Sequence, residues 1–87
     1  PRDPWIRNNL GVALRDAGAR AAWGQFEEAA RLSPGMFEPA LNLALLAERE
    51  GRWEESRRWW REAGRRRPGA PEVEAAERRL GPERRDG

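Results

Sequence analysis

The sequence predicts an all-α fold built from short antiparallel helices, and three observations support that prediction. Apolar residues recur at helical spacing through most of the 87 residues. Pairs of proline and glycine, at Pro34-Gly35, Pro68-Gly69 and Gly81-Pro82, follow the apolar segments and are typical helix stops. The stretch from residue 37 to residue 70 has a counterpart upstream, which indicates an internal repeat of a helix pair.

The first helix is expected to begin at Pro4 and to end before Gly18. Asp3 can cap the helix, and Pro4 fits its first turn, where a missing N–H costs nothing. Glycine at position 18 is a typical C-terminal stop. An apolar stripe at helical spacing should face the core, and it consists of Ile6, Leu10, Ala13 and Leu14.

A second helix is expected from about Ala21 to Leu32, ended by Ser33-Pro34-Gly35. Its inward face should consist of Ala22, Phe26, Ala29 and Ala30. Because this face is mostly small, we expect the second helix to approach its neighbours closely.

The next two helices are expected at about Glu38–Glu50 and Trp53–Arg66. Gly51 separates them, and small residues alternate with large ones along both, as suits two closely packed antiparallel helices. The inward face of the second of these helices should comprise Trp53, Ser56, Trp60 and Ala63, so both tryptophans are predicted to be core residues. Trp59 should point elsewhere, either across neighbouring helices or into solvent as an anchor.

A fifth helix is expected from about Pro71 to Leu80, with glutamates in its first turn and Gly81-Pro82 as its stop. Its apolar stripe is thin and consists of Val73, Ala76 and Leu80. The tail 81–87 has no periodicity and is expected to be flexible.

The repeat can be tested by the spacing of matching residues. In the second half of the unit, 34 residues separate five matching pairs: Pro34 and Pro68, Gly35 and Gly69, Ala29 and Ala63, Phe26 and Trp60, Ala22 and Ser56. In the first half the spacing is 33, for Leu10 and Leu43, Asn9 and Asn42, Gly11 and Ala44, Gly18 and Gly51. The first copy therefore lacks one residue in the turn between its helices.

This pattern resembles the tetratricopeptide repeat. The second copy matches that pattern at Leu43, Ala44, Gly51, Trp53, Ser56, Trp60, Ala63 and Pro68, and the first at Leu10, Gly11, Leu14, Ala22, Phe26, Ala29 and Pro34. The first copy departs in its turn and has no aromatic residue where the second has Trp53. The resemblance implies one small domain over 1–87: two antiparallel helix hairpins, at about 4–35 and 37–70, and a capping helix at about 71–80, stacked as a right-handed superhelix.

The resemblance also implies a function, which is to bind a protein or peptide segment in a concave groove lined by the first helix of each pair. The groove residues carried over are Trp5, Asn8, Asn9, Val12, Arg15 and Asp16 from the first copy, and Glu38, Leu41, Asn42, Leu45, Glu48 and Arg49 from the second. Asn9 and Asn42 match the asparagines with which the family holds a peptide backbone. The carboxylate clamp of one subclass looks absent, because its basic positions hold Asn8, Glu72 and Ala76. An apolar or amphipathic segment is therefore the expected guest, and no cofactor is expected.

Two other functions stay open from the sequence. A structural module could self-associate as a homodimer through its open ends, because no helix precedes Trp5, Ile6 and Val12 to cover them. Trp5 could therefore be either a groove anchor or a lid on that end. The arginine-rich stretch Arg57–Arg67 could contact nucleic acid, although helix-spaced glutamates accompany it and a solvated, ion-paired helix face explains most of its charge.

Composition excludes several classes of protein. The chain has no histidine, cysteine, lysine or tyrosine, so an enzyme with a nucleophile and a base is not expected. With no cysteine there is no disulfide, and three aspartates are too few to predict a carboxylate metal site. No apolar run is long enough to predict a membrane span, and the net charge of +2 demands no charged partner. The start at Pro1 suggests a segment of a longer protein, of cytoplasmic or periplasmic origin.

Overall fold

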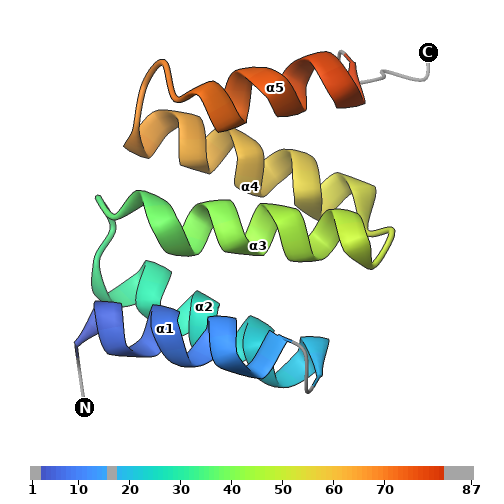
Figure 1. Ribbon diagram of the computed structural model, residues 1–87. Coiled ribbons are helices and arrows are strands. Elements are labelled where there is room, and N and C mark those ends of the chain that lie inside the picture. The colour runs from blue at the N-terminus through green and yellow to red at the C-terminus, as the bar shows by residue number, and fades with distance from the viewer. Residues whose placement is uncertain (1–2, 16–17, 82–87) are drawn as a thin grey trace.

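Five α-helices follow one another in the computed structural model, which describes residues 3–15 and 18–81 (Figure 1). They are α1 (Pro4–Arg15), α2 (Ala19–Leu32), α3 (Phe37–Arg49), α4 (Trp53–Arg66) and α5 (Pro71–Leu80). No strand occurs in these two ranges, so the all-α prediction is confirmed. The bounds of α4 and α5 are those expected, while α2 begins at Ala19 rather than at Ala21. The tail expected to be flexible lies outside the described residues from position 82 onwards.

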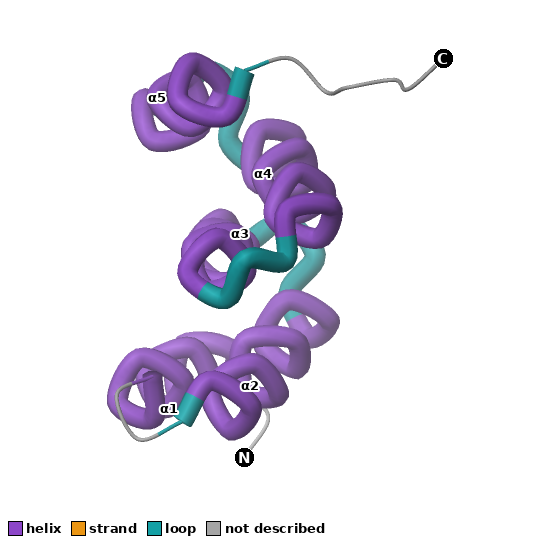
Figure 2. The backbone as a smooth tube through the Cα atoms, turned by 90° about the vertical axis from the view of Figure 1, so that its right-hand side faces the viewer, coloured by secondary structure: helices purple, strands orange, loops and turns teal. Residues whose placement is uncertain are grey.

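The helices pack mainly on their neighbours in the chain. α1 packs on α2, α2 on α3, α3 on α4 and α4 on α5, and α1 also contacts α3 directly. Viewed along the helices, α1, α3 and α5 lie along one side of the molecule, while α2 and α4 lie along the other (Figure 2). The molecule is elongated, with principal extents of 44 × 26 × 21 Å. Below, the α1–α2 pair is called the first hairpin and the α3–α4 pair the second.

Local chemistry fixes where the helices begin and end. The Asp3 carboxylate accepts a hydrogen bond from the backbone N–H of Trp5, at 2.8 Å, as the expected N-cap of α1. At the end of α3, Gly51 has a φ of 73°, a conformation that glycine adopts without strain. This conformation lets the N–H of Arg52 reach the carbonyl of Ala47 at 2.8 Å and close the helix.

The core consists of two clusters of buried side chains. One joins α2 to α3, and its buried members are Ala22, Phe26, Ala30, Leu43 and Leu46. The other joins α3, α4 and α5, and its buried members are Phe37, Ala40, Ala44, Trp60, Ala63, Ala70, Val73 and Ala76. The predicted inward face of α2 is therefore confirmed, as is the placement of Trp60 in the core. Trp59 is half-buried and packs against both clusters.

Two sequence-based core predictions are wrong. In α1, Ile6, Leu10 and Ala13 are exposed, and the buried residues are Asn8 and Gly11. The stripe is apolar as expected, but it faces a side of α1 on which the described part of the chain places no helix. Trp53 is 54% exposed, because it is the first residue of α4, beside the Gly51 turn, where no neighbouring helix buries it.

Candidate binding face

The side of the molecule formed by α1 and α3 exposes large apolar side chains. Trp5 and Val12 of α1 are 52% and 37% exposed, and Leu45 of α3 is 41% exposed. Trp5, Asn9 and Val12 have i, i+4, i+7 spacing, which places them on one stripe of α1. Glu38, Asn42 and Leu45 have the same spacing on α3 and lie 33 residues further along, so the two helices present matching stripes.

The two stripes lie next to each other. α1 and α3 are in contact, and Figure 1 shows that they run in the same direction. We call the surface formed by Trp5, Asn9, Val12, Asn42, Leu45 and Arg49 the α1–α3 face. It is a surface of mixed character, with apolar side chains between amides and an arginine.

An amide pair ties the two helices beneath this face. The Nδ2 atom of Asn42 donates a hydrogen bond to Oδ1 of Asn8 at 3.0 Å, and Asn8 is 4% exposed. Asn8 was expected to line the groove, but one helical step before Asn9 turns its side chain toward α3 instead. It therefore positions Asn42 and is not open to a ligand. The sequence signal for this role was the 34-residue spacing of Asn8 and Asn42, which the repeat comparison overlooked.

Positive charge gathers at the end of the face opposite Trp5. Arg15 and Arg49 lie in the last turns of α1 and α3, where a cation is favoured by the helix dipole. Arg49 is exposed and Arg15 is half-buried. Neither forms an ion pair or hydrogen bond with a residue in the described ranges. Both guanidinium groups can therefore accept an anionic partner. Asp16, also expected here, lies outside the described residues.

The remaining predicted groove residues serve the fold. Leu41 is half-buried and packs against the core cluster of α3, α4 and α5. The Glu48 carboxylate accepts hydrogen bonds from Nε1 of Trp60 at 2.6 Å and from Nη2 of Arg79 at 2.7 Å, which connects α3 to α4 and α5. Glu38 pairs with Arg67 at 3.0 Å at the edge of the face.

The arginine-rich stretch of α4 is largely engaged within the molecule. The guanidinium of Arg66 is almost fully buried, and it donates to the backbone carbonyls of Ala30, Ser33 and Met36 at 2.9 to 3.4 Å. These carbonyls end α2, so Arg66 caps the first hairpin from the second. Arg67 stacks over the ring of Phe37, 4.1 Å from its centroid. Sequence reasoning assigned these arginines only to the helix dipole and missed both contacts.

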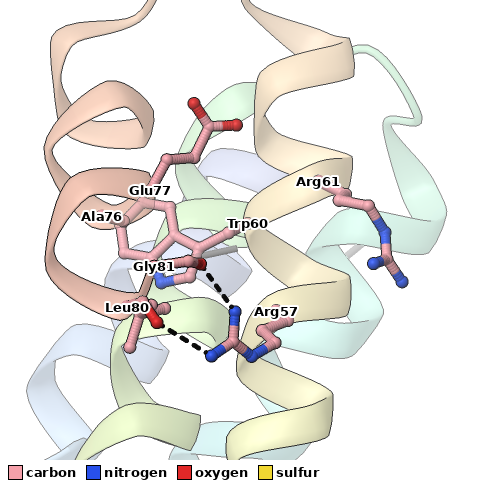
Figure 3. A pocket seen from close by; sticks show the side chains of 7 residues that line it. All are labelled: Arg57, Trp60, Arg61, Ala76, Glu77, Leu80 and Gly81. Atoms are coloured by element: carbon pink, nitrogen blue, oxygen red, sulfur yellow. Dashed lines mark hydrogen bonds between the residues drawn. The ribbon is translucent and has the colours of Figure 1, made fainter. Parts of the chain in front are cut away.

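Arg57 has a similar role at the other end of α4. Its guanidinium donates to the carbonyl oxygens of Leu80 at 2.9 Å and Gly81 at 3.0 Å, and so it caps α5 (Figure 3). A crevice of about 310 Å³ opens beside it between α4 and α5. Its walls are formed by Arg57, Trp60, Arg61, Ala76, Glu77, Leu80 and Gly81. The crevice marks a place where α5 covers α4 incompletely.

One carboxylate in α4 has a strongly shifted pKa. Hydrogen bonds from Arg65, at 2.5 Å, and Arg66, at 2.6 Å, lower the pKa of Glu62 from 4.5 to about 2. The charged form is stabilised because both partners are permanently protonated. Glu62 is therefore ionised throughout the neutral range and holds Arg66 in its capping position.

Comparisons with known proteins add no identification. No family model matches this chain, and no curated protein or solved structure matches it either. Within residues 3–15 and 18–81 no cluster of acidic side chains could hold a metal ion. Over the same residues, every helix is too short or too polar to cross a membrane.

Proposed function

We propose that the chain is a protein-interaction module that binds a segment of a partner protein on its α1–α3 face. The observation that carries this proposal is the exposure of Val12 and Leu45 at equivalent positions of two adjacent, parallel helices. A single exposed apolar residue needs no explanation, but a repeated one on matching stripes forms a continuous surface. The tetratricopeptide-like arrangement inferred from the sequence, in which such a face is the concave side of a superhelix, supports the same function.

The chemistry of the face describes the partner segment. Trp5, Val12 and Leu45 would bury apolar side chains of the guest. The amide of Asn9, which is exposed, can donate to and accept from a peptide backbone. Arg15 and Arg49 would pair with a carboxylate at one end. The expected partner is therefore an apolar or amphipathic segment that carries an acidic group at one end.

Capture of partners by the immobilised domain tests this proposal. We expect Leu45→Glu and Val12→Glu to reduce retention of a captured protein at least about tenfold, because each introduces a charge into the apolar contact. Trp53→Glu is the matched control, since Trp53 is equally exposed but lies on α4, outside the face. Equal retention by all three variants and the parent chain would refute the assignment of the face.

The arginines of α4 support this function over nucleic-acid binding. A nucleic-acid site needs arginines that are free to reach phosphates. Arg57, Arg65, Arg66 and Arg67 instead hold carbonyl groups and carboxylates of the same molecule. Binding to the partner should accordingly depend less on salt than phosphate binding does.

A further inference from the structure

A second apolar surface lies on α1, on a different side of the helix from the stripe of the α1–α3 face. Ile6 and Leu10 are 50% and 42% exposed, and Ala13 is exposed beside them. We call these three residues the outer face of α1. Their spacing of i, i+4, i+7 makes one stripe, as expected for a helix that packs on another helix.

The second hairpin shows what such a stripe does. The residues 33 positions later are Pro39, Leu43 and Leu46, and all three are almost completely buried. Leu43 and Leu46 pack against α2, at Ala22, Phe26 and Ala30. The same positions of α3 are thus the interface with the preceding helix. The outer face of α1 is the equivalent surface without its partner.

The opposite end of the molecule is built differently. In α5, Glu74 and Arg78 occupy the positions that Ala40 and Ala44 occupy in α3, 34 residues earlier. The two alanines are buried against α4, whereas both charged residues of α5 are exposed. The α5 end therefore presents charge to solvent, and the α1 end presents aliphatic side chains.

We propose that the outer face of α1 is the docking surface for the second helix of a further hairpin, linked to α1 as α2 is linked to α3. The occupant would carry an aromatic residue between small ones, as α2 does with Ala22, Phe26 and Ala30. A second copy of this chain has no such surface to offer, because α3 already covers that of α2 and α5 covers that of α4. The surface is distinct from the α1–α3 face, so the proposal does not depend on the proposed function.

Adding the hairpin and measuring thermal stability tests the proposal. The probe is a copy of residues 3–36 joined directly before Pro4, so that its second helix leads into α1 through the loop 33–36. We expect one cooperative unfolding transition, with a Tm at least about 10 °C above that of the 87-residue chain. Two separate transitions, or no rise in Tm, would overturn the proposal.

A substitution at Leu10 then shows whether the outer face is the contact. Leu10→Glu should lower the Tm by less than about 4 °C in the 87-residue chain, where Leu10 is exposed. In the extended chain the same change at the original Leu10 should cost more than about 10 °C, because it places a charge in a buried contact. Val12→Glu is the control and should have a small effect in both chains. Equal effects of Leu10→Glu in both chains would overturn the proposal, as would a dimer of the 87-residue chain that Leu10→Glu dissociates.

Discussion

At Gly11, the ring of Phe26 fills the space that a Cβ atom would need. An added Cβ would lie 2.5 Å from Cε1 of Phe26, closer than real Cβ contacts come. In the second hairpin, Ala44 stands at the equivalent position opposite Trp60, so the absence of a side chain is specific to the first hairpin. The chain here gives up helix propensity to let α1 and α2 pack closely.

This close approach predicts opposite effects for two identical substitutions. Gly11→Ala should lower the free energy of unfolding by about 1–3 kcal/mol, because Phe26 must move, although alanine is the better helix former. Gly24→Ala, on the exposed side of α2 with no atom near its added Cβ, should raise it by about 0.5–1 kcal/mol. Urea unfolding measures both, and stabilisation by both substitutions would show that α1 and α2 are less closely packed.

Glu62 predicts a loss of stability in acid. Its folded-state pKa of about 2 lies below the value of 4.5 for an unperturbed carboxyl, so its contribution is complete above about pH 4.5. The contribution is lost as the pH falls toward 2, because protonation removes the acceptor of Arg65 and Arg66. Glu62→Gln should therefore destabilise the protein at pH 7 more than at about pH 3. Equal destabilisation measured by thermal unfolding at both pH values would contradict this role of the charge.

At this scale the sequence showed which residues are special but not which way they point. Asn8 and Asn9 are adjacent and chemically identical, yet one is buried against α3 and the other is exposed. The 33-residue spacing matched Asn9 to Asn42, and it gave no indication that Asn42 bonds to Asn8. Arg66 is similar, because its three carbonyl partners lie some thirty residues away in the chain and depend on how the hairpins meet.

Among the helices, α5 is the least firmly attached. It buries Val73 and Ala76 against the core cluster, and polar contacts from Glu48 to Arg79 and from Arg57 to its last carbonyls add to this. The crevice beside Trp60 shows that this cover is incomplete. α5 nevertheless keeps Trp60 and Ala63 out of water, so its loss would expose part of the core.

Removal of α5 is therefore expected to disrupt the second hairpin. Deletion of residues 71–87 should broaden thermal unfolding, lower the Tm and promote aggregation, since Trp60 and Ala63 would then face solvent. Circular dichroism and light scattering measure the two effects. A truncated chain that stays monomeric and melts like the parent would show that α5 contributes little to the fold.

The ends of the helices were predicted well from the sequence, and the burial of their faces less well. Proline, glycine and Asp3 determine helix ends through local chemistry, which a single sequence contains. Burial of Ile6, Leu10 or Trp53 depends on a neighbouring helix, and helical periodicity does not say whether that neighbour is present. The α1 stripe was consequently read as core when it is an exposed surface.

For the whole molecule, the repeated spacing was the most informative feature of the sequence. It predicted that α1 and α3 present equivalent stripes, and Trp5, Val12 and Leu45 are indeed exposed on them. It did not predict that Asn8, Leu41 and Glu48 turn inward, because those positions face the next helix of the stack rather than solvent. The part of the candidate face that could be predicted is thus the part set by helix periodicity alone.

The unlike ends give the molecule a polarity that limits how it can assemble. Fibres form when one surface of a protomer fits a different surface of the next, and the contact repeats without closing. The aliphatic outer face of α1 finds no aliphatic counterpart at the opposite end, where Glu74 and Arg78 face water. Head-to-tail growth is therefore blocked at α5, and contacts through the outer face of α1 alone cannot extend beyond a pair.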